Sequence, residues 1–167
     1  VRGRTSHEAV FNVKNGVFRC PATQQGYSAF STWTRGLAWA ICGFAEQLEF
    51  LRSEHWKERE GPPRGSYDTG LLEICFLKAA LATADFYLEN CCRDGIPMWD
   101  TGAPGLHHLP DHLDRRSNPY NAWEPVDSSA AAIAAQGLLR LGNWLSKHGR
   151  DVVNPKRYTG AALTIAD

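Results

Sequence analysis

The chain has 167 residues, and its 18 Lys plus Arg balance 18 Asp plus Glu, so the formal net charge is zero. This length allows one domain with a hydrophobic core, and the charge balance argues against a nucleic acid or an acidic membrane surface bound through bulk charge. No apolar run is long enough to span a bilayer.

The five cysteines do not form the pattern of a disulfide framework, because their number is odd and Cys42 and Cys75 lie in apolar helical segments. Cys91 and Cys92 are adjacent, which is not a metal-ligand spacing. We expect all five, Cys20 included, to be small core residues, and this usage favours a reducing compartment.

The first 24 residues are expected to form loops and a short strand pair. Apolar residues flank Asn15-Gly16, a dipeptide that favours the tight turn of a hairpin. His7 precedes this pair.

Residues 24–46 are the most informative stretch, because a polar loop changes there into a strongly apolar helix. Thr32 or Thr34 is a candidate N-cap for that helix. Its buried stripe has the three-and-four spacing of a packed helix. The stripe consists of Leu37, Ile41, Phe44, Leu48 and Leu51. Because the helix is apolar on two faces, we expect it to be an inner helix that is covered along its Trp39 side as well.

Arg35 and Trp39 lie four residues apart, on a second side of the same helix. An Arg guanidinium binds a carboxylate through two parallel hydrogen bonds, and a Trp ring stacks on the apolar face of a sugar. The pair therefore suggests a site for a flat, acidic, partly apolar ligand. Taken singly, Arg35 could instead pair with a buried acid, and Trp39 could be a core residue.

Three further helices are predicted, near 67–92, 127–148 and from 156 onward. Ser66 or Asp68 can start the first, with a buried stripe expected at Leu71, Cys75, Ala79, Ala82 and Phe86. Asp127 is the expected N-cap of the next helix, and Gly149 its stop. The charged, Gly- and Pro-rich residues 54–65 read as a surface loop.

A long segment without periodicity follows Cys92 and extends to Asn118, which is typical of a functional loop. It contains His107, His108 and His112, whose spacing lacks the further ligands that a zinc site needs. We interpret these histidines as part of a solvated loop and predict no metal and no cofactor. Asp100 is a possible wall residue of a site, without an assigned mechanism.

Together these elements predict an all-α array in which loops at one end carry the site. The chain opens on Val1 and stops inside a helical pattern at Asp167. We therefore expect residues 1–167 to be part of a single longer catalytic domain, cut at both ends.

Three ordered blocks resemble the unsaturated glucuronyl hydrolases, glycoside hydrolase family 88. They are Gln25-Gly26-Tyr27 with residues 31–45, then Asp94-Gly95-Ile96-Pro97-Met98-Trp99-Asp100, and then residues 127–135. The resemblance covers nearly the whole chain. It implies part of a six-fold α/α barrel with about four main helices of the twelve.

The resemblance also implies an activity: removal of a 4,5-unsaturated uronic acid from the non-reducing end of lyase-made oligosaccharides. In this family an Asp protonates the vinyl ether double bond and activates water, and the hydrated product opens and releases the next sugar. The family's catalytic Asp pair lies N-terminal to the matched region. The rest of the barrel and the acid/base are thus expected upstream, and the catalytic residues of this chain are unknown.

By position, His7, Gln25, Arg35 and Trp39 match substrate-contacting residues of the family. The resemblance implies that Arg35 pairs with the uronate carboxylate, Trp39 stacks on the ring, and Gln25 and His7 bond its oxygens. Trp33 is left out of this site. Two departures are Leu37, where the family often has Gln, and the long, His-rich segment 102–125, which bears on the outer subsite and the preferred polysaccharide.

Three alternatives stay open. One is an unsaturated rhamnogalacturonyl hydrolase with the same barrel and chemistry. Another is a non-catalytic carbohydrate-binding barrel that keeps the Arg35 and Trp39 platform. The last is an α/α barrel with no sugar role, in which these two side chains point away from any cleft.

Overall fold

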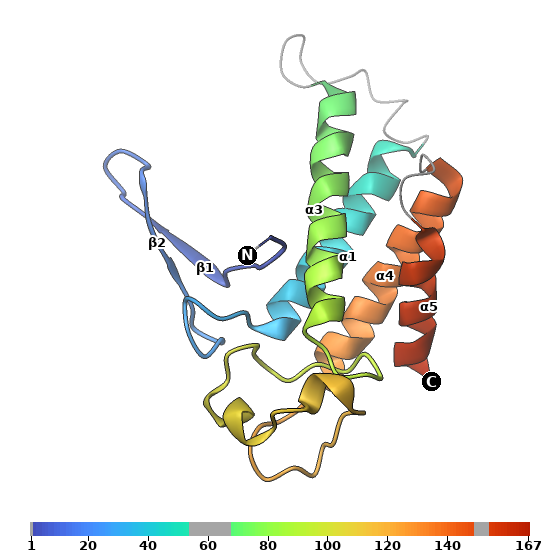
Figure 1. Ribbon diagram of the computed structural model, residues 1–167. Helices are drawn as coiled ribbons and strands as arrows, with labels where there is room; N and C mark the ends of the chain where they lie inside the picture. Colours follow the sequence, from blue (N-terminus) through green and yellow to red (C-terminus); the bar gives the residue numbers. More distant parts are fainter. Residues whose placement is uncertain (1, 54–67, 149–153) are drawn as a thin grey trace.

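The computed structural model describes residues 2–53, 68–148 and 154–167. Four helices account for about half of this described part: α1 (Thr34–Leu51), α3 (Thr69–Glu89), α4 (Ser128–His148) and α5 (Pro155–Ala166). Two strands precede them, β1 (Glu8–Phe11) and β2 (Phe18–Ala22), as Figure 1 shows. The predicted helices and the small hairpin are confirmed, while the surface loop 54–65, Ser66 and the stop at Gly149 lie outside the described residues.

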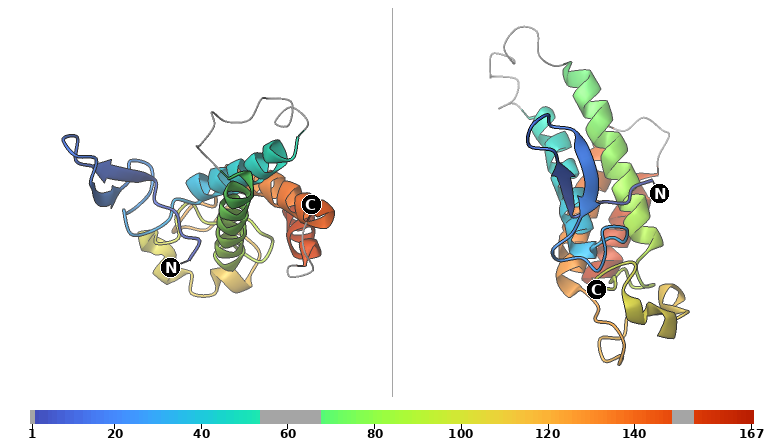
Figure 2. Two further views of the ribbon diagram at one scale, coloured as in Figure 1. Left: turned by 90° about the horizontal axis from the view of Figure 1, so that it is seen from above. Right: turned by 90° about the vertical axis from the view of Figure 1, so that its left-hand side faces the viewer.

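The helices pack in a continuous series, with α1 against α4, α3 on α1, and α5 on α4 (Figures 1 and 2). They share one hydrophobic core, to which every helix contributes fully buried side chains. The largest are Leu37, Ile41 and Leu48 of α1, Tyr87 of α3, Leu138 and Leu141 of α4, and Tyr158 of α5. None of the described helices is long and apolar enough to cross a membrane.

Helices α1 and α4 approach each other closely at a glycine. A Cβ atom on Gly137 would lie 2.8 Å from the backbone nitrogen of Cys42 and 2.9 Å from its Cα. A side chain there would push the two helices apart, so this small residue sets their spacing. The contact joins the two helices whose first residues lie at the candidate site.

The predicted stripe of α1 is confirmed: Leu37, Ile41, Leu48 and Leu51 are buried, and Phe44 packs against the core. We also expected an inner helix that is covered along its Trp39 side. That prediction is wrong for this chain, because α3 and α4 cover other sides of α1 and leave Trp39 58% exposed.

The start of α3 follows the prediction, but its buried face does not. The Asp68 carboxylate accepts hydrogen bonds from the backbone N–H groups of Gly70 and Leu71, so Asp68 is the N-cap. Of the predicted stripe only Phe86 is buried, and Leu71 and Cys75 are exposed. Apolar residues occur on all sides of α3, so periodicity indicates no single face, and contact with α1 buries Ala80, Thr83, Ala84 and Tyr87 instead.

The predicted cap of α1 is wrong and that of α4 is right. No side chain caps α1: the Thr34 hydroxyl donates to the carbonyl oxygens of Met98 at 2.7 Å and Trp99 at 3.0 Å instead. At the start of α4, Asp127 Oδ1 accepts the backbone N–H of Ala130 at 2.8 Å. The Thr34 side chain therefore bonds to a distant segment, while the Asp127 side chain caps its own helix.

The hairpin projects away from the helices (Figure 1 and the left panel of Figure 2). Its strands pair antiparallel, and Asn15-Gly16 lies in the connection as predicted. Phe11 and Phe18 form an edge-to-face contact with ring centroids 5.8 Å apart. Both rings are more than half exposed, so the hairpin contributes little to the core of the described chain.

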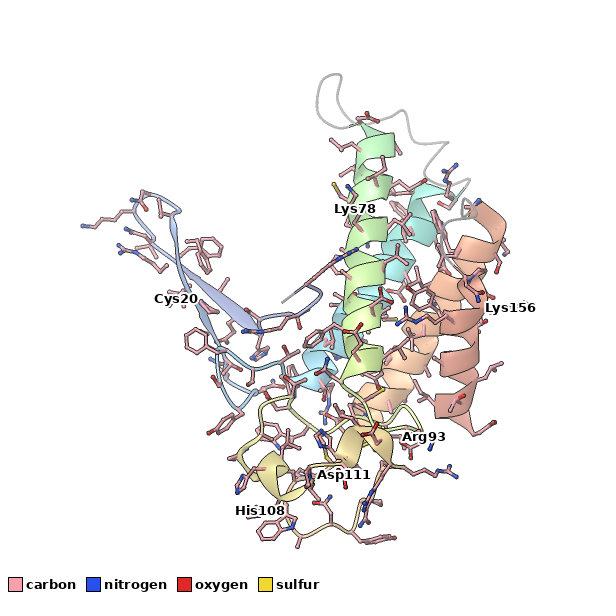
Figure 3. All side chains as sticks on the ribbon, viewed as in Figure 1. Cys20, Lys78, Arg93, His108, Asp111 and Lys156 are labelled. Carbon is pink, nitrogen blue, oxygen red and sulfur yellow. The ribbon has the colours of Figure 1, made fainter. Side chains whose placement is uncertain are left out.

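All five cysteines are free. Cys42, Cys91 and Cys92 are buried, which confirms their prediction as core residues. Cys20 and Cys75 are exposed, so the prediction is wrong for these two. Cys20 lies on the projecting hairpin, as Figure 3 shows, and Cys75 lies in the first half of α3.

Candidate functional site

A short extended segment, residues 97–101, connects the starts of α1 and α4. We call this segment the strap. On one side Thr34 donates its backbone N–H to the carbonyl of Trp99 at 3.1 Å. On the other side Asp127 donates its N–H to the carbonyl of Pro97 at 2.8 Å. The strap therefore fixes the first residues of both helices at the same end of the molecule.

Three of the residues that gather at this end surround the start of α1. The rings of His7 and Trp33 meet edge to face, with centroids 4.8 Å apart. The guanidinium carbon of Arg35 lies 5.9 Å from the Trp33 ring centroid, within the range of a cation–π contact. Trp33 thus connects two predicted site residues that are far apart in the sequence, although we left it out of the site.

Gln25 joins this group through its backbone. Nδ1 of His7 accepts the backbone N–H groups of Gln24 at 3.2 Å and Gln25 at 3.4 Å. A ring nitrogen that accepts two N–H groups carries no proton, so this geometry assigns the neutral tautomer with its proton on Nε2. His7 therefore orders the loop and offers one N–H donor on its other edge.

Arg35 makes the ion pair that we considered as the alternative to ligand binding. Its Nε and Nη2 lie 3.1 and 3.0 Å from Oδ2 of Asp127. The Asp127 side chain is 3% exposed and that of Arg35 43%, so the acid is buried while the guanidinium keeps an exposed edge. Of the five N–H donors of Arg35, those on Nη1 take no part in this pair. The pairing orients the guanidinium and leaves donors directed away from Asp127.

Trp39 lies one helical turn after Arg35 and is 58% exposed. The aromatic ring beside the Arg35 guanidinium is that of Trp33, not that of Trp39. The structure therefore brings together His7, Gln25 and Arg35 around Trp33, and places Trp39 farther along α1 with a free ring face. The position of Trp33 directly before α1 was the sequence signal that could have included it.

The long segment after α3 lies beyond the same end of the helices, where Figure 3 labels Arg93, His108 and Asp111. It forms a cavity of about 240 Å³ whose lining includes His108, His112, Arg115 and Arg116. His108 stacks on Trp123, with centroids 3.6 Å apart, and Nδ1 of His112 lies 2.7 Å from the Leu109 carbonyl. Among the described residues no three His, Cys, Asp or Glu side chains are grouped to hold a metal ion.

Three buried carboxylates lie at this end, and all have their oxygens engaged. Asp100 accepts the backbone N–H groups of Tyr27 and Gly102, each at 2.9 Å. Glu124 accepts the Trp99 indole N–H at 2.7 Å and a backbone N–H of the loop at 2.5 Å. Asp127 accepts hydrogen bonds from the backbone N–H of Ala130 and from the guanidinium of Arg35. Both oxygens of each of the three carboxylates are thus used in hydrogen bonds within the chain.

Comparison with known proteins decides the family. No protein-family model matches the chain. The unsaturated glucuronyl hydrolase of Bacillus sp. strain GL1 is 32% identical over 166 residues, 98% of this chain. That of Formosa agariphila is 29% identical over 137 residues, 81% of this chain. This chain belongs to the unsaturated glucuronyl hydrolase family.

Solved structures of the family share the fold of this chain. The Bacillus enzyme, described as responsible for the degradation of glycosaminoglycan, matches 98% of this chain with a TM-score of 0.66 and 27% identity. A variant solved with dGlcA-Glc-Rha-Glc matches equally widely, with a TM-score of 0.65. This likeness confirms the predicted fold class, an all-α portion of an α/α barrel.

The match covers only part of these unsaturated glucuronyl hydrolases. The chain spans 26% and 34% of the length of the two relatives, and 33% of the Bacillus structure. The candidate site of the described chain is therefore made by the loop at Gln25, the start of α1 and the strap.

Proposed function

We propose that the protein containing this chain is a glycoside hydrolase that removes 4,5-unsaturated uronic acid from the non-reducing end of lyase-generated oligosaccharides. The relatives named above are unsaturated glucuronyl hydrolases, and one was solved with a dGlcA-containing ligand. The observation that carries the proposal is the cluster of His7, Trp33 and Arg35 at the start of α1. A family match and a local cluster of polar and aromatic groups then point to the same ligand.

The chemistry of each group fits an unsaturated uronate. The Nη1 donors of Arg35 bind the carboxylate, while Asp127 holds the guanidinium plane. The Nε2 proton of His7 and the exposed Gln25 amide donate to carboxylate or hydroxyl oxygens. Trp39 offers an exposed ring face on which the flattened sugar ring stacks.

The catalytic acid belongs, in this proposal, to the part of the barrel outside residues 1–167. Its role is to protonate the double bond and to activate the water that adds to the vinyl ether carbon. The buried carboxylates of this chain support that division, because the hydrogen bonds of Asp100, Glu124 and Asp127 already use their oxygens. The chain contributes binding and orientation.

The test uses the complete protein that carries this chain. It is incubated with an unsaturated glucuronyl disaccharide, its saturated counterpart, and an unsaturated disaccharide from rhamnogalacturonan. Loss of the absorbance of the conjugated double bond reports turnover of the two unsaturated substrates, and release of the reducing-end sugar reports turnover of the saturated one. We expect turnover of the unsaturated glucuronyl substrate and none of the saturated one.

The other results each identify a competing function. Faster turnover of the rhamnogalacturonan fragment would assign the sister activity. Binding of unsaturated disaccharides without turnover would indicate a non-catalytic carbohydrate-binding barrel. If the protein neither binds nor turns over these disaccharides, the barrel has no sugar role.

A further inference from the structure

We propose that Asp100 is a positioning residue of the uronate site. This inference rests on the proposed function. Asp100 holds the loop of residues 23–27 so that Gln25 and its neighbours face the ligand. The residue lies in the strap and pairs with Trp33 in an isolated antiparallel bridge. Its side chain is fully buried and bonds to the loop, so it acts on the ligand through the loop.

The first observation is the burial of an ionisable side chain with two fixed acceptors. Asp100 is 0% exposed. Its Oδ2 accepts the backbone N–H of Tyr27, and its Oδ1 accepts that of Gly102, each at 2.9 Å. A buried carboxylate is stable only when its oxygens are hydrogen-bonded, so the contact between strap and loop is strongly favoured over its loss.

The second observation is that side chains accept four consecutive backbone N–H groups of the loop. Those of Gln24 and Gln25 bond to His7, that of Gly26 bonds to the Thr23 hydroxyl at 2.8 Å, and that of Tyr27 bonds to Asp100. No regular secondary structure orders this loop. Its conformation therefore depends on these acceptors, and Asp100 is the one that ties it to the start of α1.

The third observation is close packing at Gly26. A Cβ atom there would lie 2.7 Å from Thr23 Oγ1, 3.1 Å from Asp100 Oδ2 and 3.2 Å from the Trp33 Cβ. Any side chain would push the loop off the aspartate and off Trp33. Glycine at this position allows the backbone to approach the carboxylate, and a Gly26→Ala change disturbs the same contact without altering Asp100.

Asp100→Asn is the sharpest change that preserves shape. Both carboxylate oxygens accept an N–H group, but an asparagine has one oxygen and one NH₂ group. In either orientation the NH₂ group faces the N–H of Tyr27 or of Gly102, and one hydrogen bond is lost. Gly26→Ala is the second variant, which keeps the test decisive if Asp100→Asn does not fold.

Glu124→Gln is the matched control. Glu124 is also buried, at 8% exposure, and both of its oxygens also accept N–H groups, from Trp99 and Gly105. Glu124→Gln also places an NH₂ group against an N–H donor, in the same long segment. The hydrogen bonds of Glu124 go to Trp99 and Gly105 and not to residues 23–27. A general loosening of the segment would affect both variants alike.

The experiment measures hydrogen exchange of the amides at 24–27 together with kcat and KM for an unsaturated glucuronyl disaccharide, in the complete protein. We expect Asp100→Asn and Gly26→Ala to speed exchange of these amides at least tenfold. We expect KM to rise about tenfold with kcat within about threefold, because the loop binds ground state and transition state alike. Glu124→Gln should leave the exchange of these amides and KM within about twofold.

Equal effects of Asp100→Asn and Glu124→Gln, or unchanged exchange and KM in both Asp100→Asn and Gly26→Ala, would overturn the positioning role. A wild-type protein that does not turn over the disaccharide would contradict the proposed function instead. Exchange at 24–27 would then still decide whether Asp100 holds the loop.

Discussion

At the scale of single residues, the ion pair between Arg35 and Asp127 combines two tasks. Asp127 caps α4 through Oδ1 and orients Arg35 through Oδ2. The sequence predicted the cap, because an aspartate directly before an apolar helical run is a strong signal. The pairing joins residues 92 positions apart, and no local pattern contains that information.

Asp127 variants separate the two tasks. Asn caps helices as well as Asp, so Asp127→Asn keeps the cap and removes the ion pair, and we expect a loss of about 1 kcal/mol in the free energy of unfolding. Asp127→Ala removes both and should cost about 2 kcal/mol or more, since a buried acceptor is also lost. Urea denaturation of the complete protein gives both values. Equal losses in the two variants would mean that the cap contributes nothing measurable.

At the scale of elements, the sequence predicted which segments are helices better than which faces they bury. The stripe of α1 was correct because polar and apolar positions are clearly separated there. The stripe of α3 was wrong because its apolar residues surround the helix, and only contact with α1 selects the buried side. Likewise Thr32 or Thr34 was expected to cap α1, but the Thr34 hydroxyl donates to carbonyl oxygens of the strap instead.

The cysteines give a test of these buried faces. Burial raises the pKa of Cys91 to about 12, helped by the neighbouring Cys92, and burial followed by the Asp94 charge raises the pKa of Cys92 to about 11. A thiol-alkylating reagent at pH 8 should therefore label Cys20 and Cys75 and spare the buried thiols until denaturant is added. Mass spectrometry of peptides reads this out, and rapid native labelling of Cys91 or Cys92 would contradict the packing of α3.

The same thiols add an alkaline dependence of stability. Their pKa values in the folded chain are raised above the usual 9.0, so the unfolded chain releases these protons first. Their contribution is fully present below about pH 9 and falls as the pH rises toward about 11 and 12. A Cys91→Ala/Cys92→Ala double variant should show a shallower loss of stability than the wild type over this range in urea titrations.

At the scale of the whole molecule, the described chain exposes large apolar side chains on several elements. Those that are at least half exposed include Trp39 of α1, Leu71 and Ile74 of α3, and Phe11 and Phe18 of the hairpin. A soluble monomer seldom leaves so many such side chains in contact with water. In a complete α/α barrel, further helices would be available to cover them.

Residues 1–167 produced alone should therefore aggregate or dimerise. Size-exclusion chromatography with light scattering measures the mass, and thermal melting followed by circular dichroism measures cooperativity. A monodisperse, cooperatively melting monomer would contradict this prediction and show that the exposed side chains are tolerated.

The candidate site could be predicted only in part for the same reason that α3 was mispredicted. His7, Gln25, Arg35 and Trp39 came from positions in a family motif. The contacts of the strap with Thr34 and of Asp100 with Tyr27 became visible only once distant segments were placed together, because they cross 65 and 73 residues of sequence. Their roles depend on hydrogen bonds between segments that have no periodicity of their own.

The most direct test of the central claim, that this wall binds the uronate carboxylate, is Arg35→Lys in the complete protein, with Arg52→Lys as the matched control. Arg52 also makes a two-pronged pair, with Glu73 at 2.5 and 2.6 Å, but at the other end of α1. Lysine keeps the charge and loses the planar fork.

The measured quantity is kcat/KM for an unsaturated glucuronyl disaccharide, with thermal melting as the check on folding. We expect Arg35→Lys to lower kcat/KM by roughly thirty- to a thousand-fold, which corresponds to about 2–4 kcal/mol. Arg52→Lys should stay within about threefold of the wild type. Wild-type kcat/KM in Arg35→Lys would show that Arg35 serves only Asp127, and the carboxylate site would have to be sought in the cavity at Arg115 and Arg116.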